Sequence, residues 1–315
     1  MLDPTNLSPI AFTIPIGDGF AIYWYGILVV LGIAVGTFWA SREVEKRGGD
    51  QDELYSGLLV AVVSGYVFAR LTYVILEILD GNSAQYSSFI DWINLRAGGA
   101  NILGGFVGAT LAVYLYTRWR GLDLRLYADV AGPALLIAQA IGRWGNFINQ
   151  ELYGPPTTLP WGMPISIGNR IAPYNDTLTY PAETLFHPTF LYESILLLIG
   201  FVVLAYLAKQ YREKWQPGVL FGAFLVWWGI GRFIVEFFRP DQPKIGSSAI
   251  SYSMIAAILL AVVGIYWIFY VQGRAPALLP ETGSARRRRR RRSRVAKPKP
   301  RRPVAGESAG SENEA

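Results

Sequence analysis

The chain has 315 residues, of which 52% are hydrophobic and 14% aromatic, and its formal net charge is +6. This apolar content is typical of an integral membrane protein rather than of a soluble enzyme. The lack of cysteine excludes disulfides, thiolate metal ligands and a cysteine nucleophile. The single histidine argues against a histidine-based metal site.

Seven apolar stretches follow one another, each close to the ~20 residues that a helix needs to cross ~30 Å of hydrocarbon. They cover residues 20–40, 55–76, 102–119, 127–147, 189–208, 219–238 and 251–270. Arg70 and Arg143 interrupt the second and the fourth stretch. Strands of a membrane barrel need only ~10 residues and alternate in polarity. The pattern therefore predicts an all-α integral membrane protein with seven transmembrane helices.

The loops between these stretches differ in charge. Arg42, Lys46 and Arg47 follow the first stretch, and similar basic groups follow the third and the fifth, whereas the alternate loops contain few basic residues. Basic loops stay in the cytoplasm, so we expect the N-terminus outside and the C-terminus inside. No basic segment precedes the first apolar run, and we therefore expect no cleavable secretory signal.

Two pairs of glycines lie four residues apart within the predicted spans: Gly32 with Gly36, and Gly104 with Gly108. Small residues at this spacing let two helix backbones approach closely in lipid. We therefore expect these pairs to mark helix contacts.

Residues 150–187 form the longest segment on the predicted outer side, and they are rich in proline, glycine and threonine. Such a composition favours loops and turns over helix. A connection this long between membrane spans is often functional, so we expect an extracytoplasmic loop or arm here.

The C-terminal part, residues 273–315, differs from the rest. From Arg286 onward it holds 12 basic and 3 acidic residues, including seven consecutive arginines. This segment cannot bury a core, and we expect a disordered tail. Next to the cytoplasmic leaflet it would be attracted to anionic lipid headgroups. Nucleic-acid binding is the less favoured alternative. Residues 1–272 would then form the catalytic membrane domain.

Few polar side chains lie in or beside the predicted spans, and charged groups at this depth are functional candidates. They are Tyr25, Arg70, Tyr73, Asn101, Arg143, Asn146, Asn149, Glu151, His187, Tyr192, Glu193, Arg232, Glu236 and Arg239. The planar guanidinium of arginine binds two phosphate oxygens at once. Arg143 and Arg232 would therefore suit an anionic lipid headgroup, although Arg232 and Glu236, four residues apart, could also be a pair that only fixes helix packing.

Four blocks in this order resemble the prolipoprotein diacylglyceryl transferase family. They are Tyr23-Trp24-Tyr25-Gly26, the run from Gly142 to Gly154 (GRWGNFINQELYG), the run from His187 to Glu193 (HPTFLYE) and the run from Gly231 to Arg239 (GRFIVEFFR). The resemblance covers about residues 15 to 272 and implies a multi-pass enzyme of the bacterial cytoplasmic (inner) membrane.

The resemblance implies transfer of a diacylglyceryl group from phosphatidylglycerol to the lipobox cysteine of a prolipoprotein, the first step of bacterial lipoprotein maturation. Arg143 and Arg232 would stabilise the phosphate charge, Glu236 would hold Arg232, and Tyr25 would donate a hydrogen bond. The same family pattern places Asn146, Glu151, Gly154 and His187 in the phosphatidylglycerol site. It requires no metal and no organic cofactor, and no nucleic acid is expected as a partner.

One position departs from the family pattern, in which many members have a histidine near the start of the third span. Leu103 occupies that position here. His187 is the only imidazole, but it precedes a proline, where a structural hydrogen bond is as plausible. Our hypothesis is that the arginines lower the pKa of the incoming thiol, usually ~8.5, and that no histidine base is essential. Full activity of His187→Gln with wild-type pH dependence would support it, whereas a loss larger than ~100-fold would indicate His187 as the base.

Three alternatives remain at this stage. A transporter or lipid-binding scaffold would often show internal repeats, and none is evident. A retinal-type receptor would need a lysine in the last span for a Schiff base, and residues 251–270 contain none. A catalytically inactive relative of the transferases is the stronger rival because of Leu103.

Overall fold

The computed structural model describes residues 3–15, 19–93, 98–240, 242–246, 248 and 250–276. Within them, six helices are long and apolar enough to cross a membrane. They are α1 (Trp24–Lys46), α2 (Gln51–Leu79), α5 (Leu124–Asn149), α6 (Thr189–Gln210), α7 (Val219–Glu236) and α8 (Tyr252–Val271). The remaining predicted span is also a helix, α4 (Ile102–Arg120), with Arg118 and Arg120 in its last turn. The structure thus confirms a mostly helical membrane protein with six candidate spans.

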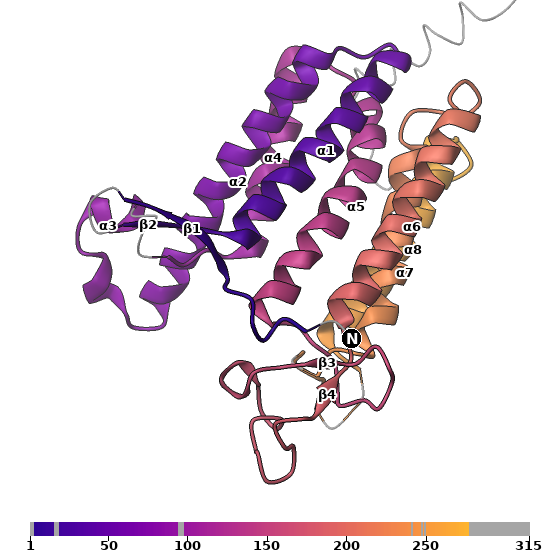
Figure 1. The fold of residues 1–315 in the computed structure, drawn as a ribbon. Coiled ribbons are helices and arrows are strands. Elements are labelled where there is room, and N and C mark those ends of the chain that lie inside the picture. Colours follow the sequence, from indigo (N-terminus) through magenta and orange to yellow (C-terminus); the bar gives the residue numbers. More distant parts are fainter. Residues whose placement is uncertain are drawn as a thin grey trace, which may run out of the picture. The chain divides into compact units, whose positions relative to one another are not determined.

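The helices pack in a defined order within residues 1–274 (Figure 1). Helix α5 is central: it packs along α1 on one side and along α6 and α7 on the other, while α8 packs against α7. Helices α2 and α4 pair with each other and make few contacts with α1 and α5. The main apolar core lies where α5, α6 and α7 meet, around Leu136, Leu197, Leu204 and Phe224. The second half of α5 is therefore surrounded by three other helices.

Both predicted glycine pairs lie at helix contacts. A Cβ atom on Gly32 or Gly36 of α1 would come within 2.5 Å and 2.6 Å, respectively, of carbonyl oxygens of α5. Gly104 and Gly108 of α4 pack against α2 in the same way. These contacts confirm the expected close packing. They hold α1, which has Tyr25 in its first turn, tightly against α5.

The two arginines that interrupt apolar spans do not break their helices. Arg70 is buried in α2 and its guanidinium donates hydrogen bonds to four backbone carbonyls. These belong to Asp91, Trp92, Gly98 and Gly99, in the connection that holds the short helices η1 (Ser83–Tyr86) and α3 (Phe89–Ile93). Main-chain acceptors thus satisfy a buried cation.

Two small antiparallel sheets correct the all-α prediction. Strands β1 (Ile10–Ile14) and β2 (Phe20–Tyr23) pair with Ile14 opposite Phe20, and β3 (Met163–Pro164) pairs with β4 (Leu185–Phe186). The first predicted span began at residue 20, but α1 begins only at Trp24. Residues 20–23 are aromatic, branched or small. They therefore suit a strand as well as a helix, and pairing with β1 decides the outcome.

Residues 150–187 pack around a hydrophobic cluster of their own. It consists of Tyr153, Met163, Ile165, Tyr174 and Phe186, together with Phe190 of α6. The segment contains turns, the short helix η2 (Ile167–Asn169), β3 and β4. Arg170 is buried within it and donates to four backbone carbonyls. This packing holds the chain firmly where it enters α6.

A polar network joins the end of α1 to the starts of α5 and α7. Asp129 of α5 accepts hydrogen bonds from the backbone N–H groups of Gly218 (2.8 Å) and Phe221 (2.7 Å) at the start of α7. Gly218 has no side chain to cap α7, so a carboxylate from another helix does so. Arg47 lies 3.6 Å from the Asp129 carboxylate and 3.0 Å from Glu43.

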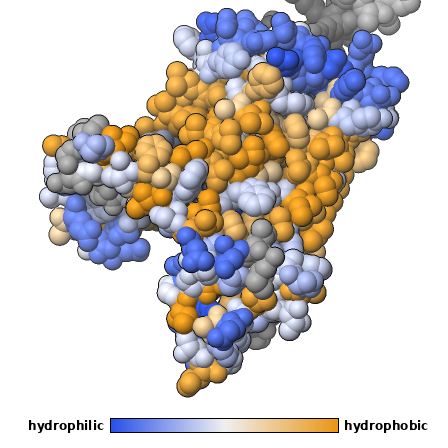
Figure 2. Space-filling model, viewed as in Figure 1, coloured by the Kyte–Doolittle hydropathy of each residue, from blue (hydrophilic) through white to orange (hydrophobic). Residues whose placement is uncertain are grey.

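The surface is divided by polarity. On the face shown in Figure 2, an apolar belt runs across the helices, with polar residues above it at the helix ends and below it on the lobe that holds β3 and β4. Exposed side chains of the belt include Val30, Leu59, Phe106, Val202 and Leu259. An apolar belt of this kind is what a hydrocarbon layer covers. The predicted disordered tail from residue 277 onward lies outside the described residues.

Candidate active site

Arg143 lies near the end of α5, between two side chains that orient it. Its Nη2 is 2.6 Å from Glu193 Oε1 in the second turn of α6, and its Nη1 donates to Asn146 Oδ1 at 3.2 Å. Asn146, one turn further along α5 and buried, donates in turn to Glu151 Oε1 at 2.7 Å. The guanidinium is thus fixed between two helices. Of its five N–H groups, one donates to Asn146, and the ion pair with Glu193 lies at Nη2.

The chain folds back after α5, and this brings Glu151 to Asn146. Gln150 and Leu152 adopt left-handed backbone conformations, with φ of 55° and 58°, which non-glycine residues adopt uncommonly. The backbone N–H of Glu151 donates to the Asn146 carbonyl at 3.0 Å. The Gln150 side chain accepts from the backbone N–H of Ser166 at 2.8 Å, which ties this turn to the β3–β4 lobe.

Arg232 lies one turn before the end of α7 and pairs with Glu236 of the same helix at 2.8 Å. Glu236 is buried, and its other oxygen accepts from the Ser251 hydroxyl at 2.7 Å. Ser251 also caps α8 through the backbone N–H of Met254. The arginine is thus positioned from α7 and, through its carboxylate partner, from the start of α8.

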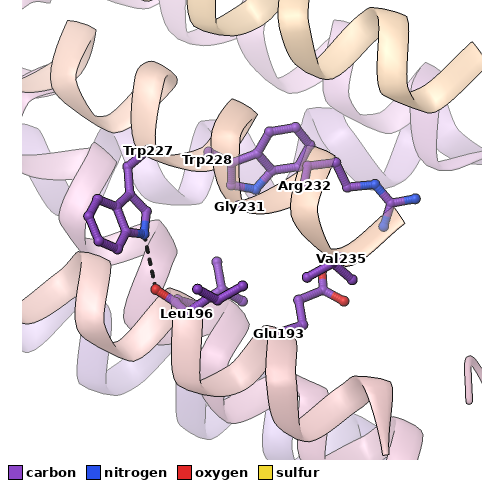
Figure 3. Close-up of a pocket in the computed structure, with 8 residues that line it drawn as sticks. Glu193, Leu196, Trp227, Trp228, Gly231, Arg232 and Val235 are labelled. Carbon is purple, nitrogen blue, oxygen red and sulfur yellow. Dashed lines mark hydrogen bonds between the residues drawn. The ribbon is translucent and has the colours of Figure 1, made fainter. Parts of the chain in front are cut away.

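A small cavity of about 20 Å³ lies between α6 and α7, close to both arginine sites. Figure 3 shows Glu193 on α6 and Arg232 on α7 at this cavity, with Val235 beside them and Trp228 further along. The space is about the size that holds one water molecule. Glu193, the partner of Arg143, therefore lines the same cavity as Arg232, so the two predicted cations belong to one cluster.

Gly154 and His187 lie together where the lobe meets α6 and α7. The backbone N–H of Gly154 donates to the His187 carbonyl at 2.9 Å. A Cβ atom on Gly154 would lie 2.7 Å from His187 Cβ, 2.8 Å from Thr189 Oγ1 and 3.0 Å from the Phe238 carbonyl oxygen. Three segments thus converge on a position that only glycine fits without a shift of its neighbours.

Hydrogen bonds orient the His187 imidazole. Its Nδ1 lies 2.9 Å from the Tyr192 hydroxyl, which accepts from Trp161 Nε1 at 2.9 Å. Because Tyr192 already accepts from Trp161, its own proton is available to His187 Nδ1, an arrangement that favours the neutral tautomer with its proton on Nε2. Burial lowers the pKa of His187 below its usual value, which also favours the neutral form.

Tyr25 lies in the first turn of α1, and its ring packs against Gly145 of α5, two residues from Arg143. Its side chain is 41% exposed. Among the described residues its hydroxyl makes no hydrogen bond, unlike the other predicted polar site residues. The hydroxyl is thus available to a ligand.

Comparison with known proteins identifies the chain. A sequence model of the prolipoprotein diacylglyceryl transferase family matches residues 9–270. The chain belongs to the prolipoprotein diacylglyceryl transferase family. It is therefore a membrane enzyme of the transferase class, and the family resemblance found in the sequence is confirmed.

Several bacterial members of the transferase family are similar to the chain over most of its length. The chain is 39% identical over 247 residues to the phosphatidylglycerol–prolipoprotein diacylglyceryl transferase of Chloroflexus aggregans, which covers 76% of this chain and 78% of the relative. It is 37% identical over 253 residues to that of Leifsonia xyli (78% and 73% covered). It is 38% identical over 248 residues to that of Halalkalibacterium halodurans (79% and 82% covered).

The predicted site residues of this transferase family member fall into three adjoining groups. Arg143, Asn146 and Glu151 form one hydrogen-bonded chain, Arg232 and Glu236 form an ion pair, and Gly154 contacts His187. Tyr25 packs beside the first group. Leu103, where many family members have histidine, lies in the first turn of α4, is 72% exposed and provides no titratable group.

Sequence spacing indicates no defined role for several residues that organise the site. Glu193 and Tyr192 were only two of many polar candidates, and Ser251 and Trp161 were not considered. One signal was available for Glu193: it is the only acidic residue in α6, an otherwise strongly apolar helix. The contacts of Ser251 and Trp161 depend on tertiary packing and have no signature in sequence spacing.

Proposed function

We propose that this chain transfers the diacylglyceryl group of phosphatidylglycerol to the thiol of a prolipoprotein lipobox cysteine. The observation that carries this proposal is the pair of arginines, Arg143 and Arg232, each held by its own carboxylate and joined around Glu193. Arginine forks fixed in this way suit a phosphodiester, because they bind two oxygens each. They would also stabilise the additional negative charge that develops on a departing phosphate.

The bond changes define what the site has to do. The cysteine sulfur attacks the glyceryl carbon that carries the phosphate oxygen, a C–S bond forms, and the C–O bond to phosphate breaks. Glycerol phosphate leaves with the electron pair of that bond, and the negative charge on the phosphate rises from one to nearly two. The thiol proton is released, and the product phosphate, with a second pKa of about 6, is one acceptor for it.

The proposed roles follow from the contacts. Arg143 and Arg232 bind the phosphate; Asn146 and Glu151 keep the Arg143 fork in place, and Glu236 does so for Arg232. These residues lie on the ends of α5 and α7, helices fixed by the main core. Positioning of this kind is worth most where charge develops in a site of low dielectric.

Tyr25, Gly154 and His187 would complete the phosphatidylglycerol site. The Tyr25 hydroxyl, without a partner among the described residues, can donate to a phosphate or glycerol oxygen. The Nε2–H tautomer of His187 would likewise be a donor rather than a base. The arginines would lower the pKa of the incoming thiol, so that the chemistry needs neither a histidine at position 103 nor a cofactor.

The proposed topology has seven spans, with α4 as the third, an outer N-terminus and a cytoplasmic C-terminus. The arginine and lysine residues in the loops after α1, α4 and α6 support this orientation, because basic loops stay in the cytoplasm. The candidate site then faces the outer leaflet, where the β3–β4 lobe would meet a secreted prolipoprotein. Residues 1–272 would be the catalytic domain, with residues 273–315 a basic tail near anionic lipid.

The test is product analysis with purified protein in detergent. Phosphatidylglycerol with a labelled non-acylated glycerol and a labelled glyceryl backbone would be supplied with a lipobox-cysteine peptide. We expect a diacylglyceryl thioether on the peptide and release of labelled glycerol phosphate, with no product on a Cys→Ser peptide. Well-folded protein that binds phosphatidylglycerol but forms no thioether would instead indicate an inactive or lipid-binding relative.

A further inference from the structure

The second turn of α6 provides a carboxylate that the proposed roles leave unexplained. Glu193 is buried, 9% exposed, and lies 2.6 Å from Arg143 of α5. It also lines the cavity that contains the Arg232 side chain of α7 (Figure 3). A lone carboxylate at the start of an apolar helix is costly to bury unless it is paired. Its location between two arginine-bearing helices therefore calls for a specific role.

Anchors on both sides fix the direction in which Glu193 points. Thr189, one turn earlier, donates through its hydroxyl to the Phe238 carbonyl just beyond α7 (3.2 Å). Ser194, the next residue, donates to the Ala140 carbonyl of α5 (2.8 Å). These bonds set the rotation of α6 against α5 and α7. As a result, Glu193 meets the Arg143 fork from the α6 side, while Asn146 meets it from α5.

We propose that Glu193 is the positioning residue of Arg143 in the transfer reaction: it fixes the guanidinium plane so that the unused N–H groups form a bidentate phosphate clamp. This inference rests on the proposed function. One of the five N–H groups, on Nη1, donates to Asn146, and Glu193 forms an ion pair at Nη2. At least one N–H then remains on each terminal nitrogen, together with that of Nε. Phosphate binding through two parallel N–H groups needs this plane to be fixed.

The arrangement parallels that of the second arginine. Glu236 pairs with Arg232 and is itself held by Ser251. Each arginine thus has one carboxylate that sets its orientation, from the next helix for Arg143 and from its own helix for Arg232. A residue that acts only in this way should lose its influence on catalysis once its arginine can no longer form the clamp.

The experiment is a double-mutant cycle between Glu193→Gln and Arg143→Lys, in which lysine retains the charge but loses the planar fork. We would measure kcat, KM for phosphatidylglycerol and equilibrium binding of phosphatidylglycerol micelles by tryptophan fluorescence. Glu193→Gln alone should lower kcat/KM about 10- to 100-fold, a factor typical of losing precise donor placement. In the Arg143→Lys background the same change should have less than about a threefold effect, because coupled residues are non-additive.

Glu43→Gln is the matched control, since it removes the charge of another buried carboxylate that pairs with arginines, Arg47 and Arg212, and that does not contact Arg143. It should lower the melting temperature and leave kcat/KM within about threefold. If Glu193→Gln folds poorly, Glu193→Asp provides the second variant, with the charge kept and the side chain one methylene shorter; it should lower kcat/KM by an intermediate factor.

The outcomes separate the two proposals. Equal fold-losses from Glu193→Gln in both backgrounds, or a single-variant loss below threefold, would overturn the positioning role. Wild-type protein that forms no thioether would contradict the transferase proposal instead. In that case the double-mutant cycle, measured by phosphatidylglycerol binding, still tests the positioning role of Glu193, because phosphate binding by Arg143 does not depend on turnover.

Discussion

Gly154→Ala tests whether the point where the lobe, α6 and α7 meet is packed as tightly as the structure indicates. The added methyl carbon would lie 2.7 Å from His187 Cβ, 2.8 Å from Thr189 Oγ1 and 3.0 Å from the Phe238 carbonyl oxygen. Non-bonded heavy atoms prefer separations of about 3.5–4.0 Å. Two of these three contacts come from backbone or from a Cβ atom, so no side-chain rotation can relieve them.

The expected magnitude follows from these overlaps. Relief requires the surrounding segments to separate by roughly 0.7 Å or more, and overpacking of this kind typically costs about 1–3 kcal/mol of stability. The displaced groups include His187 and the start of α6, which carries the partner of Arg143. A shift of about 1 Å at a catalytic site can lower the rate about 10²-fold. We therefore expect turnover per folded molecule to fall about 10²-fold, a loss comparable in free energy to the loss of stability.

The assay compares thermal unfolding in detergent and thioether formation for wild type, Gly154→Ala and Gly57→Ala. Gly57 lies in α2, where a new methyl group would make only ordinary contacts with Tyr116 at 3.8 Å or more. That control should be as active as wild type and slightly more stable, because alanine favours helix over glycine by about 1 kcal/mol. Gly154→Ala with wild-type stability and turnover would refute the packing argument.

Other regions give further expectations. His187 has a lowered pKa in the folded protein, so its stabilising contribution is present above the unfolded value of 6.5 and is lost as pH falls. The melting temperature of wild type should therefore fall more steeply between pH 7 and pH 5 than that of His187→Gln. Parallel melting curves for the two proteins would contradict this. Asp129→Asn removes a charged acceptor from the start of α7 and should cost about 2–3 kcal/mol without changing turnover per folded molecule, as denaturation and activity titrations would show. Gly32→Val should push α1 away from α5 and lower both stability and thioether formation; unchanged values would mean that this contact is loose. Removal of the residues after Gly273 should preserve membrane insertion and activity, and a strict requirement for the tail in the transfer assay would contradict its assignment.

The sequence indicated most of the helices because their boundaries are marked by composition. Helix α4 begins at the predicted residue 102, after its N-cap Asn101. Helix α6 begins at the predicted residue 189, directly after Pro188. Arg70 and Arg143 were expected to weaken their spans, yet α2 and α5 are continuous. A hydropathy pattern reflects the unfavourable free energy of burying a cation. It does not show the carbonyls and carboxylates that offset this free energy, because they come from residues distant in sequence.

The candidate site was predictable to the extent that its partners are close in sequence. The Arg232–Glu236 pair follows from a four-residue spacing on one helix face, and the contact between Arg143 and Asn146 from a three-residue spacing. The Arg143–Glu193 pair joins residues 50 positions apart, and it requires α6 to pack on α5 with one particular rotation. No local pattern specifies that rotation, so only the folded chain assigns Glu193 its partner.

The central claim is that Arg143 and Arg232 together bind and stabilise the phosphate of phosphatidylglycerol. The most direct measurement is the rate of thioether formation on a lipobox-cysteine peptide by wild type, Arg143→Ala and Arg232→Ala, with folding checked by thermal unfolding. We expect transfer by wild type and a loss of at least about 10²-fold in each variant, as for removal of one donor to a developing charge. Either folded variant retaining near wild-type turnover would contradict it.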